Sequence, residues 1–425
     1  MLNSKGEREL AYVVLIDNIE PIPGYDRVEW ATVGGWKVIV QKDQFKVGDP
    51  AIYFEIDSKV PKDKECFAFL EKRNYKIKTL KMCKVLSQGL LMHASDFGWA
   101  IKYIPKETKD NLSLTQVPVI VDDKNNIHSV DDESRFLTSI LGITYADAED
   151  NQRKAPSADK YKKMAQRHPA IFKKPFVRWL MKRSWGRKLM FFFFGKKKDK
   201  KNGWPAWVSK TDEERIQNMP WILNDDGVWI ITEKIDGSST TFTMKRGKRG
   251  KNEFYVCSRN VCFDSVDKPC YYDTNIYWEM AQKYDMYNVL SNLLDIYPCD
   301  WVTIQGETYG AGVQRRDYSL EGHDFMAFNL ITSDKGRWNS CTMKNLLENA
   351  YNIPCVPIIN TDFHFSLLDE VRLDPEITRL DTLLKMADGN SAIDGKPREG
   401  FVLRSDDGTK SFKAVSNSFL LKYHS

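Results

Sequence analysis

The sequence lacks any uncharged apolar run of about 18 residues, the length that a membrane-spanning helix requires. It begins MLNSKGEREL, without the apolar stretch of a secretory signal. Its eight cysteines form no CxxC pair, and none of its six histidines falls in a metal-ligand pattern. We therefore expect a protein with reduced thiols and no zinc. It is expected to be neither secreted nor integral to a membrane, and to be cytoplasmic, or nuclear or organellar if the source is eukaryotic.

The length of 425 residues predicts two or three domains. Hydrophobic residues make up 42% and charged residues 28%, which is ordinary for a soluble globular protein. This composition excludes a disordered or fibrous chain and supplies enough apolar side chains for more than one core.

Positive charge is concentrated in one segment. The whole chain carries a net charge of +5, yet residues 160–203 contain 16 Lys or Arg and one Asp. That segment is therefore +15, which leaves about −10 for the remainder. Such a segment favours a polyanionic partner, because Lys and Arg that neutralise phosphates release condensed counterions. A solvated linker is the alternative.

The first hundred residues have the pattern of a small β-barrel. Strand-like runs at 12–16, 36–40 and 51–56 are separated by turn signals such as Pro23-Gly24 and Gly34-Gly35. A strand pair over 76–91 completes about five short strands, the number of an OB-type barrel. We predict an OB-fold domain at residues 1–100, although a barrel with no binding role of its own is also compatible with this pattern.

Residues 101–203 are predicted to be a linker or insert, with a short helix near 131–141 and the basic segment 160–203. Residues 176–194 could form a basic amphipathic helix. Such a helix can pack on a neighbouring domain, contact nucleic acid or lie on a membrane surface, and the sequence leaves these three alternatives open.

Residues 204–425 alternate β-rich and helical patterns, which predicts an α+β domain. Strands are expected at 227–233, 239–245, 254–258, 301–307, 324–330, 400–404 and 411–415, and helices at 276–287, 343–351 and 377–386. The predicted fold is thus α+β, with an OB-type barrel ahead of a second domain.

One strand of this domain ends in residues that carry chemistry. The run 228–239 leads from apolar residues into Glu233, Lys234, Asp236 and Gly237. A lysine at a strand end can attack phosphorus once its pKa is lowered from about 10.4 by a neighbouring cation, which a carboxylate would hold. Alone, the KxDG pattern is weak, because it is also a common strand-to-turn transition with a surface salt bridge.

Further blocks follow this motif in order: CSRN at 257–260, IQGETY at 304–309, FMAFNL at 325–330, REGFVLR at 398–404 and SFKAVSN at 411–417. This order resembles that of the covalent nucleotidyltransferases, the superfamily of ATP-dependent polynucleotide ligases and mRNA capping enzymes. The resemblance implies an ATP-grasp-like ligase domain of antiparallel sheets with flanking helices.

The resemblance also implies roles for individual residues. Lys234 would be the nucleophile that takes AMP from ATP, Glu233, Asp236 and Gly237 would be its motif neighbours, and Arg259 would contact the ribose or an incoming 5′-phosphate. Glu307 would bind the ribose hydroxyl, Phe328 would stack on adenine, and Lys413 would neutralise the α-phosphate. Asp236, Glu307 and Glu399 would organise Mg²⁺ or Mn²⁺. Such families often carry a second lysine at the position of Val415, a role that Lys410 or Lys422 could take here.

The order of the domains favours one family within this superfamily. DNA ligases and capping enzymes carry their OB domain after the last motif, whereas here about a dozen residues follow Lys413 and the barrel-like pattern comes first. With the run SKTDEERIQN at 209–218, this arrangement resembles the RNA ligase 5 family, which has an N-terminal OB domain. The resemblance implies an ATP-dependent RNA ligase that acts in RNA repair. It would seal a 3′-hydroxyl to a 5′-phosphate, in a nicked duplex with RNA on the 3′-hydroxyl side, through lysyl-AMP and an adenylylated RNA 5′ end.

The partners implied are RNA and ATP, and we expect a monomer. Alternatives within the superfamily are a DNA ligase and a GTP-dependent capping enzyme. An alternative of another class is a non-catalytic OB-fold RNA-binding protein. The presence of Lys234, Asp236, Glu307 and Glu399 argues against such a loss of catalysis.

Overall fold

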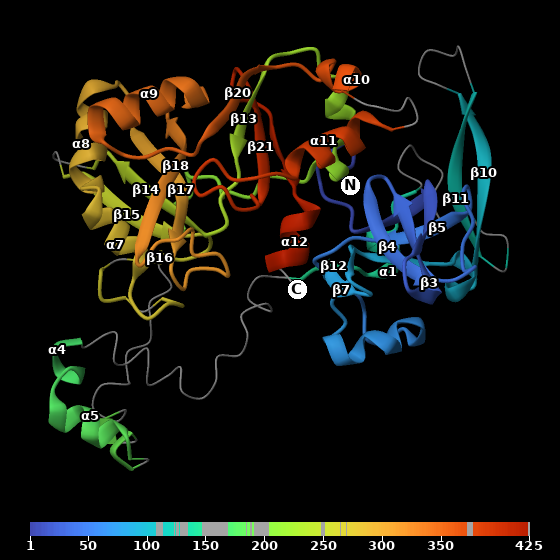
Figure 1. Cartoon of the computed structure of the whole chain (residues 1–425), viewed down its shortest axis with the longest axis horizontal. Coiled ribbons are helices and arrows are strands. Elements are labelled where there is room, and N and C mark those ends of the chain that lie inside the picture. The colour runs from blue at the N-terminus through green and yellow to red at the C-terminus, as the bar shows by residue number, and fades with distance from the viewer. Residues whose placement is uncertain are drawn as a thin grey trace.

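The computed structural model describes residues 1–107, 114–122, 124, 127, 135–146, 169–183, 185–187, 189–190, 204–247, 251–263, 265–268, 270–371 and 377–423. Figure 1 shows a β-barrel at the N-terminal end of the chain, a two-sheet domain formed by its C-terminal half, and a short helical unit set apart from both. No helix among these residues is long and apolar enough to cross a membrane.

The N-terminal domain is an OB-type barrel, as the strand pattern predicts. Its main sheets have the orders β1-β5-β9 and β2-β3-β4, all antiparallel. These strands are β1 (Ala11–Leu15), β2 (Asn18–Ile22), β3 (Tyr25–Val33), β4 (Trp36–Gln41), β5 (Pro50–Phe54) and β9 (Leu90–Met92). Trp36, Tyr53 and Phe54 are fully buried, and because Tyr53 and Phe54 are consecutive, both faces of β5 are covered.

Several elements that the sequence pattern did not predict extend this barrel. The 3₁₀ helix η1 (Glu65–Arg73) buries Phe67 in the barrel core, and a long hairpin joins β10 (Trp99–Glu107) to β11 (Leu114–Asp122). β12 (Thr144–Tyr145) pairs with β6 (Ser58–Lys59). β7 (Leu80–Met82) and β8 (Val85–Ser87) form the antiparallel strand pair that was predicted over 76–91, and η2 (Ala94–Phe97) is a further short element.

Part of the predicted insert therefore packs on the barrel. Leu137, Leu141 and Ile143 belong to its core, and α1 (Thr138–Leu141) is the short helix expected within 131–141. Residues 131–134 of that expected helix lie outside the described residues. The division of the chain at residues 100 and 203 remains a prediction.

The C-terminal domain contains two antiparallel sheets. The larger sheet has the order β16-β15-β14-β17-β18-β19 and the smaller has the order β20-β13-β21-β22. The strands are β13 (Trp229–Glu233), β14 (Ser238–Lys245), β15 (Glu253–Ser258), β16 (Cys262–Phe263), β17 (Trp301–Gly310), β18 (His323–Thr332), β19 (Gly336–Arg337), β20 (Ile358–Phe363), β21 (Gly400–Ser405) and β22 (Ser411–Val415). All seven strands expected in this half are present.

Helices complete a separate core for each sheet. α7 (Ile276–Lys283), α8 (Met286–Ile296) and α9 (Ser340–Tyr351) pack on the larger sheet, and α10 (Leu367–Val371) and α11 (Arg379–Ala387) on the smaller. Two 3₁₀ helices, η3 (Ile216–Asn218) and η4 (Pro220–Asn224), precede β13. The single helix predicted at 276–287 is two helices, because Asp285 adopts a left-handed backbone conformation with φ 47°.

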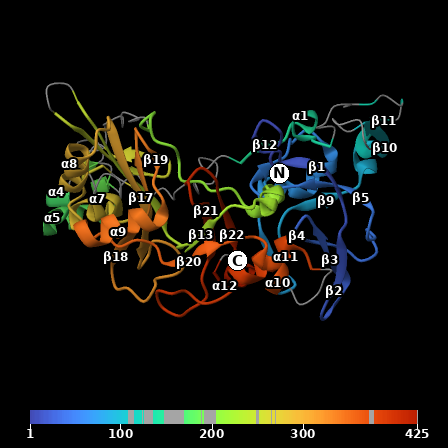
Figure 2. The same ribbon diagram turned by 90° about the horizontal axis from the view of Figure 1, so that it is seen from above.

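The barrel contacts the smaller sheet and the last helix, α12 (Asn417–Tyr423), and the two views agree on this arrangement (Figures 1 and 2). Leu86 of the barrel packs with Val415 and Leu420, and Lys81 Nζ donates a hydrogen bond to the Leu421 carbonyl oxygen at 2.9 Å. The Arg215 guanidinium lies over the Trp36 ring, 5.6 Å from its centroid. The two domains therefore share an apolar and cation–π interface.

The basic segment includes two described helices, α4 (Pro169–Phe172) and α5 (Pro175–Met181). Val177, Leu180 and Met190 form a small core with Ile171, Phe172 and Met181. The expected helix at 176–194 is thus present as α5 and the helical residues that follow, while residues 191–194 lie outside the described residues.

Candidate active site

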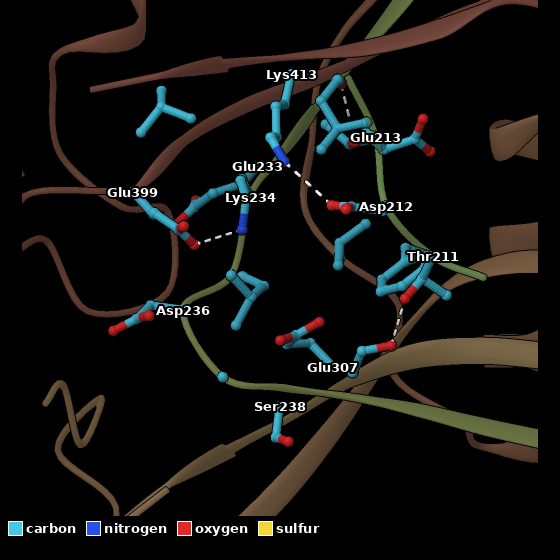
Figure 3. Close-up of a pocket in the computed structure, with 18 of the residues that line it drawn as sticks. Thr211, Asp212, Glu213, Glu233, Lys234, Asp236, Ser238, Glu307, Glu399 and Lys413 are labelled. Carbon is cyan, nitrogen blue, oxygen red and sulfur yellow. Dashed lines mark hydrogen bonds and ion pairs between the residues drawn. The ribbon is translucent and has the colours of Figure 1, made fainter. Parts of the chain in front are cut away.

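A cavity of about 420 Å³ lies between the two sheets of the C-terminal domain. Its walls come from the end of β13, from β14, β17, β18, β21 and β22, and from the segment that precedes η3. All the residues predicted to carry chemistry line this cavity: Glu233, Lys234, Asp236, Gly237, Arg259, Glu307, Phe328, Glu399 and Lys413. Figure 3 shows Lys234, Asp236, Glu307, Glu399 and Lys413 around this common space.

Lys234 is held at the point where β13 ends. Its backbone N–H donates to the Gly400 carbonyl oxygen at 3.0 Å, and its Nζ lies 2.7 Å from Glu399 Oε2 (Figure 3). Burial alone would lower the pKa of this lysine, but the carboxylates of Glu399, Glu307 and Asp236 outweigh burial and raise it. The amine is therefore an ammonium ion in this arrangement.

Glu307 faces Lys234 from β17. Burial, reinforced by the neighbouring carboxylates of Glu399 and Asp236, raises its pKa to about 8, although Lys234 opposes that shift. Gly237 lies directly beside Glu307: a Cβ at this glycine would be 2.8 Å from Glu307 Cγ and would overlap the Thr308 carbonyl oxygen. A glycine is required here for the turn to approach β17 this closely.

Asp236 is almost fully buried, and its backbone N–H donates to the Tyr318 hydroxyl at 2.8 Å. Its carboxylate shares the cavity with those of Glu307 and Glu399, the oxygen donors that a hard divalent cation prefers. Among the described residues, no three acidic, His or Cys side chains are close enough to ligate one ion directly. This donor set fits a cation that keeps much of its water shell, as Mg²⁺ does.

Lys413 and Arg259 approach one carboxylate, that of Asp212. Arg259 Nη2 lies 2.6 Å from Asp212 Oδ2, and Lys413 Nζ lies 3.4 Å from Asp212 Oδ1 (Figure 3 draws the Lys413 pair). Burial alone would raise the pKa of Asp212, but Lys413 and Arg259 lower it. Two cations that converge on one anion form an arrangement that can also bind a phosphate.

Glu233 and Phe328, two of the predicted site residues, contact other parts of the ligase domain around the cavity. The carboxylate of Glu233 is buried and accepts a hydrogen bond from the Ala392 backbone N–H at 2.8 Å, so it stabilises the 391–395 loop. The Phe328 ring packs with Val356 and Met326 on one side of the cavity, and the Arg404 guanidinium lies 5.8 Å from its centroid. Phe328 thus provides a flat apolar wall of the kind on which a base stacks.

The segment 211–215 was not predicted to supply individual site residues. It runs beside β22, with the Lys413 N–H donating to the Glu214 carbonyl oxygen at 2.8 Å, and it brings Thr211, Asp212, Glu213 and Arg215 to the cavity. The run SKTDEERIQN contributed to the family resemblance and was the available signal for these residues. Its side chains could not be assigned to partners because those partners, such as Arg259, Arg404 and Lys413, lie in segments that are distant in the sequence.

Position 415 is a valine where related families often have a lysine, and neither Lys410 nor Lys422 supplies a cation to the cavity in its place. Lys410 pairs with Asp225, Lys422 lies over the Tyr423 ring, and neither lysine lines the cavity. The additional cations that do line it are Arg215 and Arg404. The Arg404 guanidinium is 3% exposed and lies 3.2 Å from Glu213, and burial lowers its pKa to about 10.

A strand-end lysine, three carboxylates, a flat aromatic wall and clustered cations in one cavity define a covalent nucleotidyltransferase. Comparisons with known proteins agree. Residues 10–94 match a family model described as an OB-fold domain, and residues 227–424 match the RNA ligase family model. The comparisons therefore give an RNA ligase domain at residues 227–424, preceded by an OB-fold domain.

Solved structures of a Naegleria gruberi RNA ligase match nearly the whole chain. The ligase with pyrophosphate is 25% identical over 98% of this chain and 99% of that chain, with a TM-score of 0.60. A mutant of that ligase with ATP and Mn is 26% identical over 98% and 100%, with a TM-score of 0.61. Another mutant, with AMP and Mn, is 25% identical over 98% and 99%, with a TM-score of 0.60. No curated protein matches the chain.

Proposed function

We propose that this protein is an ATP-dependent RNA ligase that joins a 3′-hydroxyl to a 5′-phosphate through a lysyl-AMP intermediate on Lys234. The observation that carries this proposal is the position of Lys234 Nζ in a cavity it shares with Asp236, Glu307, Glu399 and Lys413. The solved RNA ligase relatives with ATP, AMP and Mn support the same choice of nucleotide and cation.

In the first step the Lys234 amine attacks the α-phosphorus of ATP, a P–N bond forms, and the bond to pyrophosphate breaks. The amine must first lose a proton, and Glu399, 2.7 Å away, is the carboxylate placed to accept it. Lys413 is placed to neutralise charge on the α-phosphate, and Phe328 to hold the adenine. Glu307 is placed to bind the ribose hydroxyl. Asp236, Glu307 and Glu399 would hold a hydrated Mg²⁺ or Mn²⁺, which supplies electrostatic stabilisation of the phosphates.

In the second step AMP passes from Lys234 to an RNA 5′-phosphate, and in the third a 3′-hydroxyl displaces AMP. Arg259 lies at the exposed end of the cavity, where its guanidinium can bind the incoming 5′-phosphate. The preferred substrate under this proposal is a nicked duplex with RNA on the 3′-hydroxyl side. Selectivity for RNA would come from the 2′-hydroxyl and the A-form geometry. The barrel would grip the duplex beside the break, and the basic segment 160–203 would add phosphate contacts.

The direct test is incubation with α-labelled ATP and Mg²⁺ or Mn²⁺, followed by detection of label on the denatured protein. We expect label on the wild type, none on Lys234→Ala, and undiminished label on the control Lys344→Ala, whose lysine pairs with Glu348 on α9. Label that persists in Lys234→Ala would contradict the assignment of the nucleophile. A wild type that takes no label with either cation would favour the non-catalytic RNA-binding alternative.

Sealing assays separate the enzyme alternatives. Nicked duplexes with an RNA or a DNA 3′-hydroxyl strand, each with ATP or GTP, should give efficient sealing with RNA and ATP only. Efficient sealing with a DNA 3′-hydroxyl would favour a DNA ligase, and transfer of GMP a capping enzyme. We also propose that the protein is a monomer in the cytoplasm, which light scattering and localisation of the tagged protein would check.

A further inference from the structure

The helical unit of residues 169–190 presents aromatic rings to solvent. Phe176, Trp179 and Trp185 are 67%, 45% and 53% exposed. Phe176 stacks on Trp179 with centroids 5.8 Å apart and planes 19° apart, and Trp179 meets Trp185 edge to face at 6.5 Å. Trp179 thus contacts both of the other rings, so the three side chains form one exposed surface.

Cations surround these rings. The Arg183 guanidinium lies 3.8 Å from the centroid of the Trp179 ring, a cation–π contact. Residues 169–190 contain seven Lys or Arg and no Asp or Glu. The remainder of the chain outside the basic segment is negative by about ten charges, so this unit is a local site of attraction for an anion.

The unit does not use these rings for its own packing. Its small core is built from Val177, Leu180 and Met190, which are buried, together with partly buried neighbours on α4 and α5. Most of its aliphatic side chains and the Phe172 ring therefore pack inward, whereas the other three rings are exposed, as is Leu189. This arrangement argues against the prediction that the rings pack on a neighbouring domain, because in that case they would be the buried side chains.

We propose that the Phe176–Trp179–Trp185 surface binds single-stranded RNA next to the break, with bases stacked on the rings and phosphates on the surrounding Lys and Arg. The proposal rests on the proposed function, which supplies the RNA. Every base has a flat π-face, so such a surface binds single strands with little sequence preference. A membrane surface is the competing partner, but a helix lying at that interface turns a continuous apolar face outward, whereas here most aliphatic residues are inside the unit.

The test compares RNA binding by the full-length protein and its variants. Two substrates are used, a nicked duplex and the same duplex carrying a single-stranded RNA extension, with affinity measured by fluorescence anisotropy. We expect Trp179→Leu and Trp185→Leu to weaken binding of the extended substrate by about tenfold each, the lower range for loss of one stacked base, and to change binding of the plain nick little. Leucine keeps an apolar side chain at positions outside the small core, so the helical unit should stay folded, which circular dichroism checks.

Two further variants test whether the effect on RNA binding is specific to this aromatic surface. Trp221→Leu removes a tryptophan of similar exposure, 50%, from η4 of the ligase domain, and it should leave binding of both substrates unchanged. Arg183→Lys keeps the charge but loses the planar group, so it should weaken binding of the extended substrate more than binding of the plain nick.

Labelling of Lys234 by ATP serves as the separate measure of the proposed function. Normal labelling together with unchanged RNA binding in both Leu variants would overturn the stacking surface while leaving the ligase assignment intact. Absence of labelling in the wild type would overturn the ligase assignment. Flotation with phosphatidylcholine vesicles, with and without phosphatidylserine, tests the competing partner. Binding to the anionic vesicles that is lost in Trp179→Leu, with no effect of that variant on RNA binding, would identify a membrane surface instead.

Discussion

Lys234 and Glu399 are 165 positions apart in the sequence, yet Lys234 Nζ and Glu399 Oε2 lie 2.7 Å apart in the cavity. The contact follows from strand pairing, because β13 and β21 are antiparallel neighbours with Glu233 opposite Phe401. The residues just beyond this pair, Lys234 and Glu399, therefore lie at the same edge of the sheet. Glu399 helps to raise the pKa of Lys234 and therefore lowers the fraction of this amine that is neutral.

We expect the rate of lysyl-AMP formation to rise with pH in the wild type, because the carboxylates around Lys234 raise its pKa and only the neutral amine attacks. In Glu399→Gln, loss of one carboxylate removes a cause of that raised pKa. The rate should then be lower overall, but its rise should occur at lower pH. Single-turnover labelling at saturating ATP and Mg²⁺ across a pH series measures both effects. A rise at the same pH in both proteins would show that Glu399 does not control the amine.

Asp212 pairs with Arg259 and Lys413, the two cations that a phosphate of ATP would otherwise contact. In Asp212→Asn, Arg259 and Lys413 lose their shared anion, so ATP no longer has to displace a carboxylate. We expect ATP to bind about threefold to tenfold more tightly, the range of a 0.7 to 1.4 kcal/mol change.

The measurement for Asp212 is made in a Lys234→Ala background, where the covalent step is absent. Asp212→Glu, which keeps the charge, is the matched control and should stay near the parent affinity. Weaker ATP binding in Asp212→Asn would mean that Asp212 serves to position the two cations for phosphate, rather than to compete with it.

Gly237→Ala should impair the site without unfolding the protein. The new Cβ would overlap the Thr308 carbonyl oxygen and press on Glu307 Cγ, so the Lys234–Gly237 turn must move away from β17. We expect at least a tenfold loss of labelling, because displacement of reacting groups by about 1 Å can cost about a hundredfold in rate. Gly322→Ala is the control, since a Cβ there meets nothing within 4 Å. Full activity of Gly237→Ala would show that the turn tolerates the shift.

Glu213 stabilises the fold behind the cavity. Its carboxylate pairs with Arg404 at 3.2 Å and with Arg337 at 3.8 Å. In Glu213→Gln, Arg404 would remain buried without its counterion, which should lower the free energy of unfolding by about 3 to 5 kcal/mol at neutral pH. Urea denaturation measures this difference, and Glu348→Gln, on the half-exposed Lys344 pair, is the control, with an expected change below about 1 kcal/mol.

The Glu213 contribution should also depend on pH. Burial alone would raise the pKa of Glu213, but Arg404 and Arg337 hold it below its ordinary value of 4.5. A carboxyl with a lowered pKa in the folded state stabilises the protein above its unfolded pKa and loses that contribution as pH falls. The difference between wild type and Glu213→Gln should therefore be constant near neutral pH and shrink below about pH 4.5. A difference that persists unchanged in acid would contradict the ion pair as its cause.

The strands and the cavity residues were predictable from the sequence because their signals are local. Lys234 directly follows an apolar strand, Glu307 lies within one and Glu399 directly precedes one, and ordered motifs along one chain indicate one shared site. The break between α7 and α8 was not predictable, since it depends on the left-handed conformation of Asp285. The pairing of Asp212 with Arg259 and Lys413 was also not predictable, because three separate segments meet there.

Arg215 belongs at once to the wall of the nucleotide cavity and to the interface with the barrel, where its guanidinium lies over Trp36. A single side chain thus joins the surface expected to grip the duplex to the chamber where chemistry occurs. A tilt of the barrel against the ligase domain would therefore move a residue that lines the cavity.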